Sequence, residues 1–176
     1  MSPDVDLERF KLAHERGGVA HGSTYAQAIA ELRAGKKSSH WIWYVFPQAL
    51  EGSSLNSRTY QIRHLAEAKA YVADDLLWGR YVESVVALEQ SLWRVGVVDG
   101  ALPKLEEVVG TTLDARKVRS SLTLFFNVTK NDTSERTAAF RELVDYRGRN
   151  LPIIWGGFMS CALTHDVWQR WQSEEA

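Results

Sequence analysis

Hydrophobic residues recur along most of this chain at intervals of three and four positions, which places them on one face of an α-helix. The longest such pattern covers residues 75–95 and is typical of a helix in a bundle. Its apolar positions are Tyr81, Val85, Leu88, Leu92 and Val95. Because the same period dominates elsewhere, the sequence predicts an all-α fold: one compact domain, residues 1–176, with six to eight helices.

Polar residues and glycines mark where several of the predicted helices begin and end. Thr24 and Gln27 form a capping box ahead of an apolar stripe, and Gly35 ends that helix. Asp114 is expected to cap the helix that carries Arg119. The other predicted helices lie before Gly17, after Asp132 and at residues 65–72, 104–109 and 166–172.

Two apolar segments lack this periodicity. Residues 41–46 form an unbroken run of aromatic and β-branched side chains that ends at Pro47. A buried helical turn, an extended segment and a short strand all fit this run. Residues 151–161, which include Pro152 and the pair Gly156-Gly157, leave the same alternatives open.

Composition and charge exclude several classes of protein. The 21 basic and 22 acidic residues are dispersed and leave a net charge of −1, so no nucleic-acid partner is expected. No apolar run approaches the roughly 18 residues of a membrane span, and the N-terminal residues lack an apolar signal region. Cys161 is the only cysteine, which excludes an internal disulfide. We therefore expect a cytoplasmic protein with no membrane partner.

Motifs for metals, cofactors and nucleophilic catalysis are missing from the sequence. The five histidines do not have metal-ligand spacing, and no Gly-x-Gly-x-x-Gly, P-loop or Gly-x-Ser-x-Gly motif occurs. Thr164, His165 and Asp166 are adjacent on one predicted helix and cannot adopt triad geometry, so we interpret Asp166 as a helix N-cap. No metal and no cofactor is expected.

The richest combination of side chains follows the helix that ends at Gly35. Two lysines, two serines and a histidine precede the aromatic run, as expected for a pocket that binds a phosphorylated or nucleobase-like ligand. The alternative is structural: the rings belong to the core, His40 is a buried hydrogen-bonding group and the lysines are solvated. Under either interpretation Trp41 and Phe46 should be mainly buried, with Tyr60 packed near them.

Within this block stand His40-Trp41-Ile42-Trp43 and Phe46-Pro47-Gln48, and residues 117–125 contain Arg119-Ser120-Ser121. Together these segments resemble the signature of DUF1810, a family of uncharacterised, small, helical and mostly bacterial proteins, some of them mislabelled as calpastatins. The resemblance covers about residues 6–126. It implies a compact multi-helical fold and no established activity. Residues 150–176 form a tail that departs from the pattern.

The candidate catalytic residues centre on His40, because histidine as a residue type titrates near neutral pH and serves as an acid or a base. The resemblance brings along Glu31 and Glu67 as carboxylates that would orient His40, and Glu31 is the closer of the two in sequence. The alternative for Glu31 is a place on a solvated helix face.

Arg116, Lys117, Arg119, Ser120 and Ser121 form a second polar cluster, in which Arg119 and Ser120 lie off the apolar stripe of their helix. The planar guanidinium of arginine suits phosphate or carboxylate groups. We expect His40 and Arg119 to lie across one cavity, because each cluster alone is an ordinary helix face or helix end. The predicted ligand-binding residues are Ser39, Trp41, Trp43, Gln48, Tyr60, Arg119 and Ser120.

The leading functional hypothesis is a small-molecule site for a phosphorylated or nucleotide-related metabolite. The competing hypothesis is a non-catalytic helical interaction module, whose tail packs on a partner protein or on a second copy to form a homodimer. That tail would use Ile153, Ile154, Trp155, Trp168 and Trp171.

Overall fold

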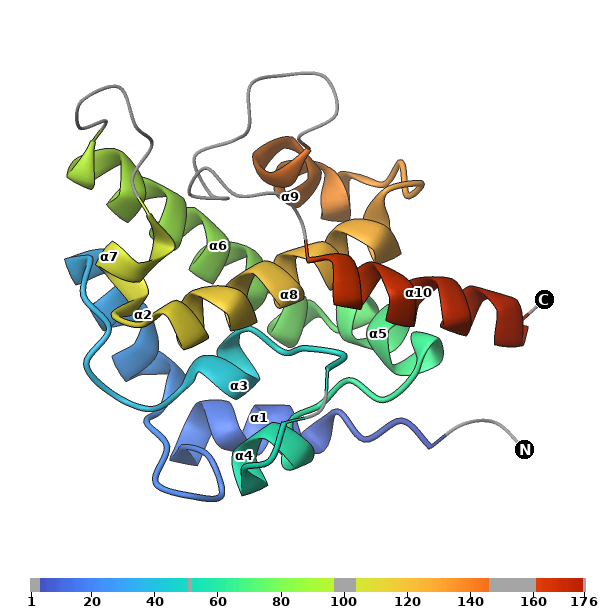
Figure 1. Cartoon of the computed structure of the whole chain (residues 1–176), viewed down its shortest axis with the longest axis horizontal. Helices are drawn as coiled ribbons and strands as arrows, with labels where there is room; N and C mark the ends of the chain where they lie inside the picture. The colour runs from blue at the N-terminus through green and yellow to red at the C-terminus, as the bar shows by residue number, and fades with distance from the viewer. Residues whose placement is uncertain (1–3, 51, 97–103, 146–160, 176) are drawn as a thin grey trace.

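The computed structural model describes residues 4–50, 52–96, 104–145 and 161–175, and these contain ten α-helices and no strand (Figure 1). The predicted all-α class is confirmed. The helices outnumber the predicted six to eight because two of them, residues 42–45 and 55–59, have only four and five residues, too few for an apolar period to appear. They are α1 (Glu8–Arg16), α2 (Tyr25–Ala34), α3 (Ile42–Val45), α4 (Leu55–Thr59), α5 (Leu65–Ala73), α6 (Asp75–Val95), α7 (Leu105–Val109), α8 (Thr112–Thr129), α9 (Glu135–Val144) and α10 (Ala162–Glu175).

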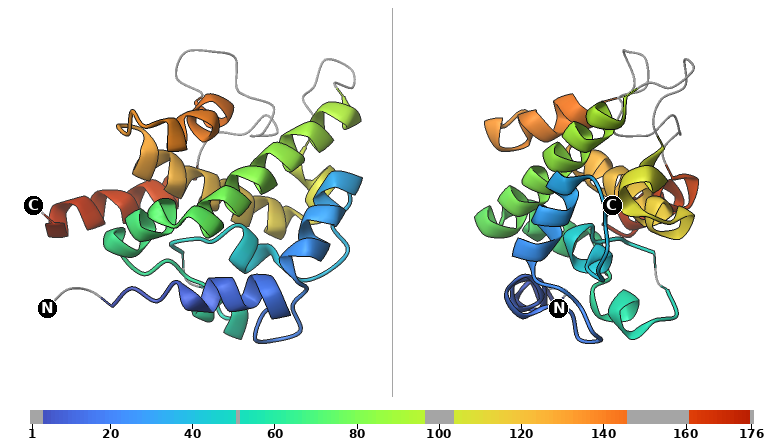
Figure 2. Two further views of the ribbon diagram at one scale, coloured as in Figure 1. Left: turned by 180° about the vertical axis from the view of Figure 1, so that it is seen from behind. Right: turned by 90° about the vertical axis from the view of Figure 1, so that its left-hand side faces the viewer.

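Helix α8 runs through the middle of the fold, as both Figure 1 and Figure 2 show. Helices α3, α5, α7, α9 and α10 all contact it. Helix α6 packs against α2, α5, α7 and α9, and α1 lies against α2 and α3. None of the helices in the described ranges is long and apolar enough to cross a membrane.

Aromatic side chains from α6, α8 and α9 fill the centre of the core. Trp78 stacks on Tyr81 with ring centroids 5.4 Å apart, and Tyr81 lies 4.6 Å from Phe125. Phe140 meets Trp78 edge-on at 5.2 Å. The predicted stripe of α6 is confirmed for Tyr81, Val85, Leu88 and Leu92, which are all buried, whereas Val95 at the helix end is exposed.

Capping signals predicted the ends of α2 but not the start of α8. Thr24 accepts the N–H of Gln27 at 3.3 Å, and Gly35 ends α2 with a φ of 75°, as predicted. Asp114 does not cap α8, because Thr111 accepts the N–H of Asp114 at 3.0 Å instead. Two good capping residues compete at this point, and the threonine holds the position. The carboxylate of Asp114 is thereby left for other partners.

The start of α10 also differs from the prediction. The helix begins at Ala162, so Asp166 lies inside it rather than at its N-cap. A contact with α8 anchors the first turn, since the hydroxyls of Thr164 and Ser120 lie 2.9 Å apart. Helix α9 begins after Ser134, whose N–H is accepted by the carboxylate of Asp132 at 2.8 Å.

The aromatic run at residues 41–46 forms the single turn of α3 and is buried as predicted. Trp41 and Phe46 are both 0% exposed. Tyr60 is also buried, but its described ring contacts are with Tyr44 at 5.1 Å and Phe10 at 6.0 Å. Residues 151–160, most of the second irregular segment, lie outside the described residues.

His14 of α1 is held as a neutral ring inside the fold. Its Nε2 lies 2.9 Å from the carbonyl oxygen of Tyr44, and the ring stacks on Tyr25 at 5.1 Å. Its Nδ1 has no hydrogen-bond partner among the described residues. Burial lowers the pKa of His14 to about 4, with help from the charge of Arg80 and against the hydrogen bond to Tyr44.

We expect this histidine to make the protein sensitive to mild acid. The unfolded chain protonates His14 below its ordinary pKa of 6.5, whereas the folded chain does not until about 4. The free energy of unfolding should therefore fall by about 2 kcal/mol between pH 7 and pH 5 through this residue alone. Urea unfolding at the two pH values measures the loss. His14→Gln keeps an N–H donor but does not titrate, so an equal fall in that variant would assign the pH dependence to another group.

Candidate functional site

The site is built on the loop that joins α2 to α3. The N–H of Lys37 donates to the carbonyl oxygen of Val108 in α7 at 2.8 Å. The N–H groups of Ser38 and Ser39 both donate to Oε2 of Glu31, at 2.8 and 3.1 Å. These three hydrogen bonds hold the loop against α2 on one side and α7 on the other.

Glu31 is the acceptor around which this loop folds. It is only 9% exposed, and the same Oε2 accepts the indole N–H of Trp41 at 2.8 Å. Burial opposes ionisation, but hydrogen bonds from Ser39, Ser38 and Trp41 outweigh burial and lower the pKa of Glu31 to about 2. Glu31 is therefore charged at neutral pH and anchors the loop.

His40, the predicted acid or base, ends this loop at the protein surface. Its side chain is exposed, so it is not the buried hydrogen-bonding group of the structural alternative. Its carbonyl oxygen accepts the N–H of Ser23 at 2.9 Å and the hydroxyl of Tyr44 at 2.8 Å. The carboxylate of Glu31 is directed to the loop N–H groups and the indole, so its described hydrogen bonds do not orient the imidazole.

Two lysines share one carboxylate where this loop meets α8. Nζ of Lys37 is 2.8 Å from Oδ2 of Asp114, and Nζ of Lys117 is 2.8 Å from Oδ1. The side chains are 10% exposed in Lys37, 15% in Lys117 and 11% in Asp114, so water screens these charges weakly. Burial opposes ionisation of Asp114, but the hydrogen bonds from Lys117 and Lys37 outweigh it and lower the pKa of Asp114.

Each lysine also lies over a tryptophan of the aromatic run. Nζ of Lys37 is 5.5 Å from the ring centroid of Trp41, and Nζ of Lys117 is 4.3 Å from that of Trp43. Both distances are within the range of cation–π attraction. Trp41 is fully buried, whereas Trp43 is partly buried. We call Lys37, Trp41, Trp43, Asp114 and Lys117 the paired-lysine site.

Lys37 of the loop and Lys117 of α8 meet at Asp114, but Arg119 and Ser120, the predicted binding residues of α8, do not take part in this contact. Successive residues of an α-helix are about 100° apart around its axis, so Arg119 leaves α8 on nearly the opposite side from Lys117. The hydroxyl of Ser120 contacts that of Thr164, and Ser120 is buried between α8 and α10. A cavity shared by His40 and Arg119 stays a prediction.

Gln48 and Tyr60 were also predicted to bind the ligand. They lie on either side of α4, and each makes a hydrogen bond to another segment of the chain. The carbonyl oxygen of Gln48 accepts the N–H of Ile62 at 2.8 Å. The hydroxyl of Tyr60 accepts the N–H of Val19 at 3.1 Å, and burial raises the pKa of Tyr60. Of the predicted binding residues, Ser39 lies in the loop of the paired-lysine site, and Trp41 and Trp43 belong to it.

The charged members of the site were not predicted as site residues. Asp114 and Lys117 have the spacing of three that favours an ion pair on one helix, and this signal was available in the sequence. No sequence pattern connects either residue to Lys37. Lys37 reaches them because its loop is held against the end of α7, next to the start of α8.

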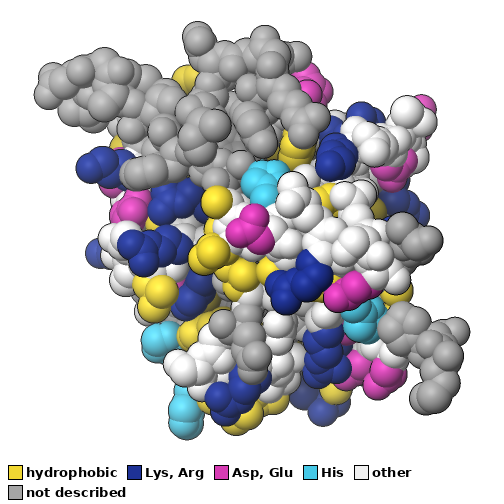
Figure 3. Space-filling model, turned by 45° about the vertical axis from the view of Figure 1, so that its right-hand side comes forward, with side chains coloured by type: hydrophobic (Ala, Val, Ile, Leu, Met, Phe, Trp, Pro, Cys, Tyr) yellow, Lys and Arg dark blue, Asp and Glu magenta, His cyan; other side chains and the backbone are white. Residues whose placement is uncertain are grey.

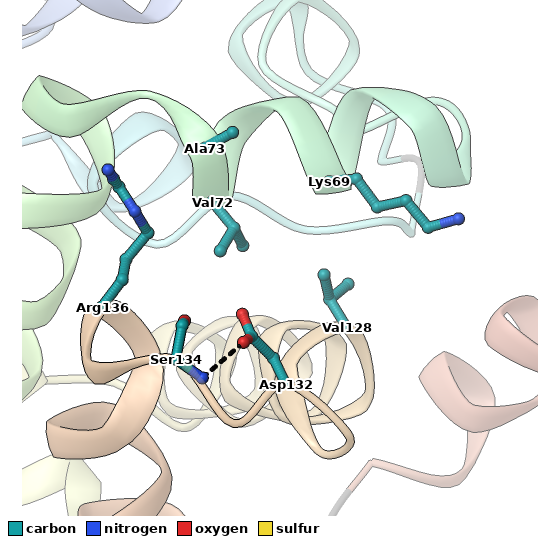
Figure 4. A pocket seen from close by; sticks show the side chains of 7 residues that line it. All are labelled: Lys69, Val72, Ala73, Val128, Asp132, Ser134 and Arg136. Atoms are coloured by element: carbon teal, nitrogen blue, oxygen red, sulfur yellow. Dashed lines mark hydrogen bonds between the residues drawn. The ribbon is translucent and has the colours of Figure 1, made fainter.

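A hollow of about 430 Å³ between α5 and the α8–α9 turn is a second candidate (Figure 4). Lys69 and Arg136 lie at its opposite ends, and Val72 points across it toward the turn that carries Asp132. Arg136 already pairs with Asp75 at 2.5 Å, and Asp132 accepts the N–H of Ser134. Since these charges have partners within the chain, the hollow is a weaker candidate than the paired-lysine site.

The face of the molecule drawn in Figure 3 does not show a cluster of charges of one sign. Figure 3 shows basic and acidic side chains interspersed with apolar ones on one face of the molecule. Within the described ranges, no three His, Cys, Asp or Glu side chains lie close enough together to hold a metal ion. The paired-lysine site therefore carries the functional argument.

Comparison with known proteins places the chain in a family. DUF1810, described as a protein family of unknown function, matches residues 4–148, further along the chain than the resemblance at 6–126. The crystal structure of the conserved hypothetical protein Rv1873 from Mycobacterium tuberculosis is similar, with a TM-score of 0.57 and 36% sequence identity over 78% of this chain and 85% of that one. No curated protein matches. The chain belongs to the DUF1810 family of proteins of unknown function.

Proposed function

We propose that the paired-lysine site binds the anionic group of a small phosphorylated metabolite. The observation that carries this proposal is the charge imbalance: two ammonium groups share the single carboxylate of Asp114. No ion pair joins Glu31 to either lysine among the described residues, because the hydrogen bonds of Glu31 go to the loop and to Trp41. An unbalanced charge that is mostly buried is costly, and a bound anion would remove that cost.

The chemistry of the two lysines fits a phosphate group. Each ammonium has three N–H donors, and Asp114 takes one donor from each lysine. The remaining donors can bind phosphate oxygens, and charge-assisted hydrogen bonds of this kind are among the stronger ones in proteins. The loop hydrogen bonds of Lys37 and Glu31 already fix one wall of the site, so binding would lose little loop entropy.

The competing interaction-module hypothesis receives less support. It assigned partner contacts to the tail, but Trp168 and Trp171 of α10 are 6% and 7% exposed. Both rings are covered within this chain and do not form an exposed aromatic patch. Ile153, Ile154 and Trp155 lie outside the described residues. The proposal is one of binding, since the exposed side chain of His40 has no described carboxylate partner to support a catalytic role.

A pair of lysine variants tests the proposed site. Lys117→Met should weaken the binding of inorganic phosphate and of ribose 5-phosphate at least about tenfold, because a charged hydrogen bond is worth about 1.5–3 kcal/mol. Lys36 is exposed and lies next to Lys37 in the same loop, so Lys36→Met is the matched control and should bind as the wild type does. Titration calorimetry at constant ionic strength gives the dissociation constants.

Two results would contradict the proposal. One is a wild-type protein that shows no binding and no thermal stabilisation with either phosphate compound, since a ligand at 100 times its dissociation constant stabilises by about 2.7 kcal/mol. The other is an equal loss of affinity in Lys36→Met and Lys117→Met. That result would indicate general electrostatic attraction to the surface rather than a defined site.

A further inference from the structure

The tryptophan faces that are turned toward the two lysines of the paired-lysine site are already occupied. The ammonium of Lys117 lies 4.3 Å from the centroid of Trp43, so it covers the face of the ring that lies beside the proposed phosphate-binding lysines. Lys117 is held there by Asp114 at 2.8 Å. Stacking of a ligand on this face would require Lys117 to move away from both of these partners.

Trp41 is closed to a ligand on every side that the structure describes. It is 0% exposed, Lys37 lies over its ring at 5.5 Å, and Phe46 lies at 6.4 Å on a tilted plane. Its indole N–H is already donated to Glu31. Tyr44 and Tyr60 are buried in the core and likewise have no exposed face.

These two observations restrict the chemical class of ligand that the paired-lysine site can bind. On the basis of the proposed function, we infer that the paired-lysine site takes phosphate esters of small polar alcohols and sugars, and does not recognise a nucleobase. A base binds protein mainly by stacking on an aromatic face, and such stacking is worth about 1–3 kcal/mol. Displacing Lys117 to free that face would also remove one of the two cations that bind the phosphate. The same lysine cannot allow both interactions.

The comparison of AMP with ribose 5-phosphate isolates the base, since the two ligands carry the same phosphate on the same sugar carbon. We expect their dissociation constants, measured by titration calorimetry on the full chain, to agree within about threefold. Stacking of the base would instead make AMP tighter by roughly 5- to 150-fold. AMP binding that is tighter by tenfold or more overturns the inference and leaves the proposed phosphate site standing.

A variant of Trp43 distinguishes two roles of its ring, which are to pack under Lys117 and to stack on a nucleobase. Trp43→Leu removes the ring under Lys117, and we expect it to weaken AMP and ribose 5-phosphate by the same factor. A loss confined to AMP would show that the base stacks on Trp43 and would overturn the inference. If neither ligand binds the wild-type protein, the proposed function fails as well, so the two failures are distinguishable.

Discussion

Replacement of Glu67 by alanine should lower the free energy of unfolding by about 3 kcal/mol, because it leaves the buried guanidinium of Arg9 with only the half-exposed carboxylate of Asp6, 4.0 Å away, as a counter-charge. Glu67 is 0% exposed, and its Oε1 lies 2.7 Å from NH1 of Arg9, whose side chain is 8% exposed. The other carboxylate oxygen accepts the N–H of Arg63 at 2.8 Å. Arg9 cannot turn outward to water without losing its bonds to the carbonyl oxygens of Asp6, Thr59 and Gln61.

A surface ion pair provides the matched control for this prediction. Asp75 lies 2.5 Å from Arg136, but their side chains are 88% and 40% exposed, so Asp75→Ala should cost at most about 1 kcal/mol. The double variant Arg9→Met, Glu67→Leu should recover part of the loss, because it leaves no buried charge unpaired. Urea unfolding at pH 7 measures all three. A loss below about 1 kcal/mol in Glu67→Ala would show that the backbone carbonyls and Asp6 satisfy Arg9 without Glu67.

The Arg9 cluster illustrates why the sequence predicts helices better than it predicts their contacts. The capping box of Thr24 and Gln27 depends on residues three positions apart, and one helical turn brings them together wherever the helix lies. Arg9 instead meets Glu67 only after α4 and the start of α5 have folded back on α1. The resemblance to DUF1810 implies that Glu67 is a partner for His40. No local sequence pattern indicates that Glu67 pairs with Arg9 instead.

The charge of the candidate site depends on which residue caps α8, and the sequence does not decide between two candidates. Thr111 and Asp114 are both good capping residues, and only one of them can cap α8. With Thr111 as the cap, the carboxylate of Asp114 binds Lys37 and Lys117, and the site acquires its charge. The rings could be predicted, because Trp41 and Trp43 stand in one unusual apolar run. The position of Lys117 over Trp43 could not be predicted, because it depends on how α3 packs against α8.

Glu31→Gln should lower the free energy of unfolding at pH 7 by about 3 kcal/mol, the equivalent of a carboxyl group whose pKa falls from 4.5 to about 2 on folding. A single charged oxygen accepts three N–H groups from Ser38, Ser39 and Trp41. A neutral amide oxygen binds them more weakly, and the amide nitrogen of glutamine cannot accept a hydrogen bond from them.

The pH dependence distinguishes this charge from other effects of the substitution. Because the folded pKa of Glu31 lies below its ordinary value of 4.5, the stabilisation is complete above about pH 5 and is lost as the pH falls toward 2. The wild type should therefore lose stability through this window, in addition to the His14 loss at higher pH. Glu31→Gln should lose less there, because its side chain does not titrate. Unfolding curves that differ by a constant amount from pH 7 to pH 3 would show that the charge of Glu31 is not the cause.

The same variant should also weaken phosphate binding at the paired-lysine site by about tenfold. Residues that orient the ligands of a metal cost about 10- to 100-fold when they are changed, and Glu31 orients the loop of Lys37 in a comparable way. Glu31 fixes Ser38 and Ser39 next to Lys37, so its loss lets the ammonium sample more positions. Glu83→Gln is the control: Glu83 pairs with Arg33 at 2.6 Å, and both side chains are at least 42% exposed. The indole N–H resonance of Trp41 reports whether the Glu31 bond is broken. A shifted Trp41 resonance together with unchanged phosphate affinity would show that Glu31 stabilises the fold without positioning the site.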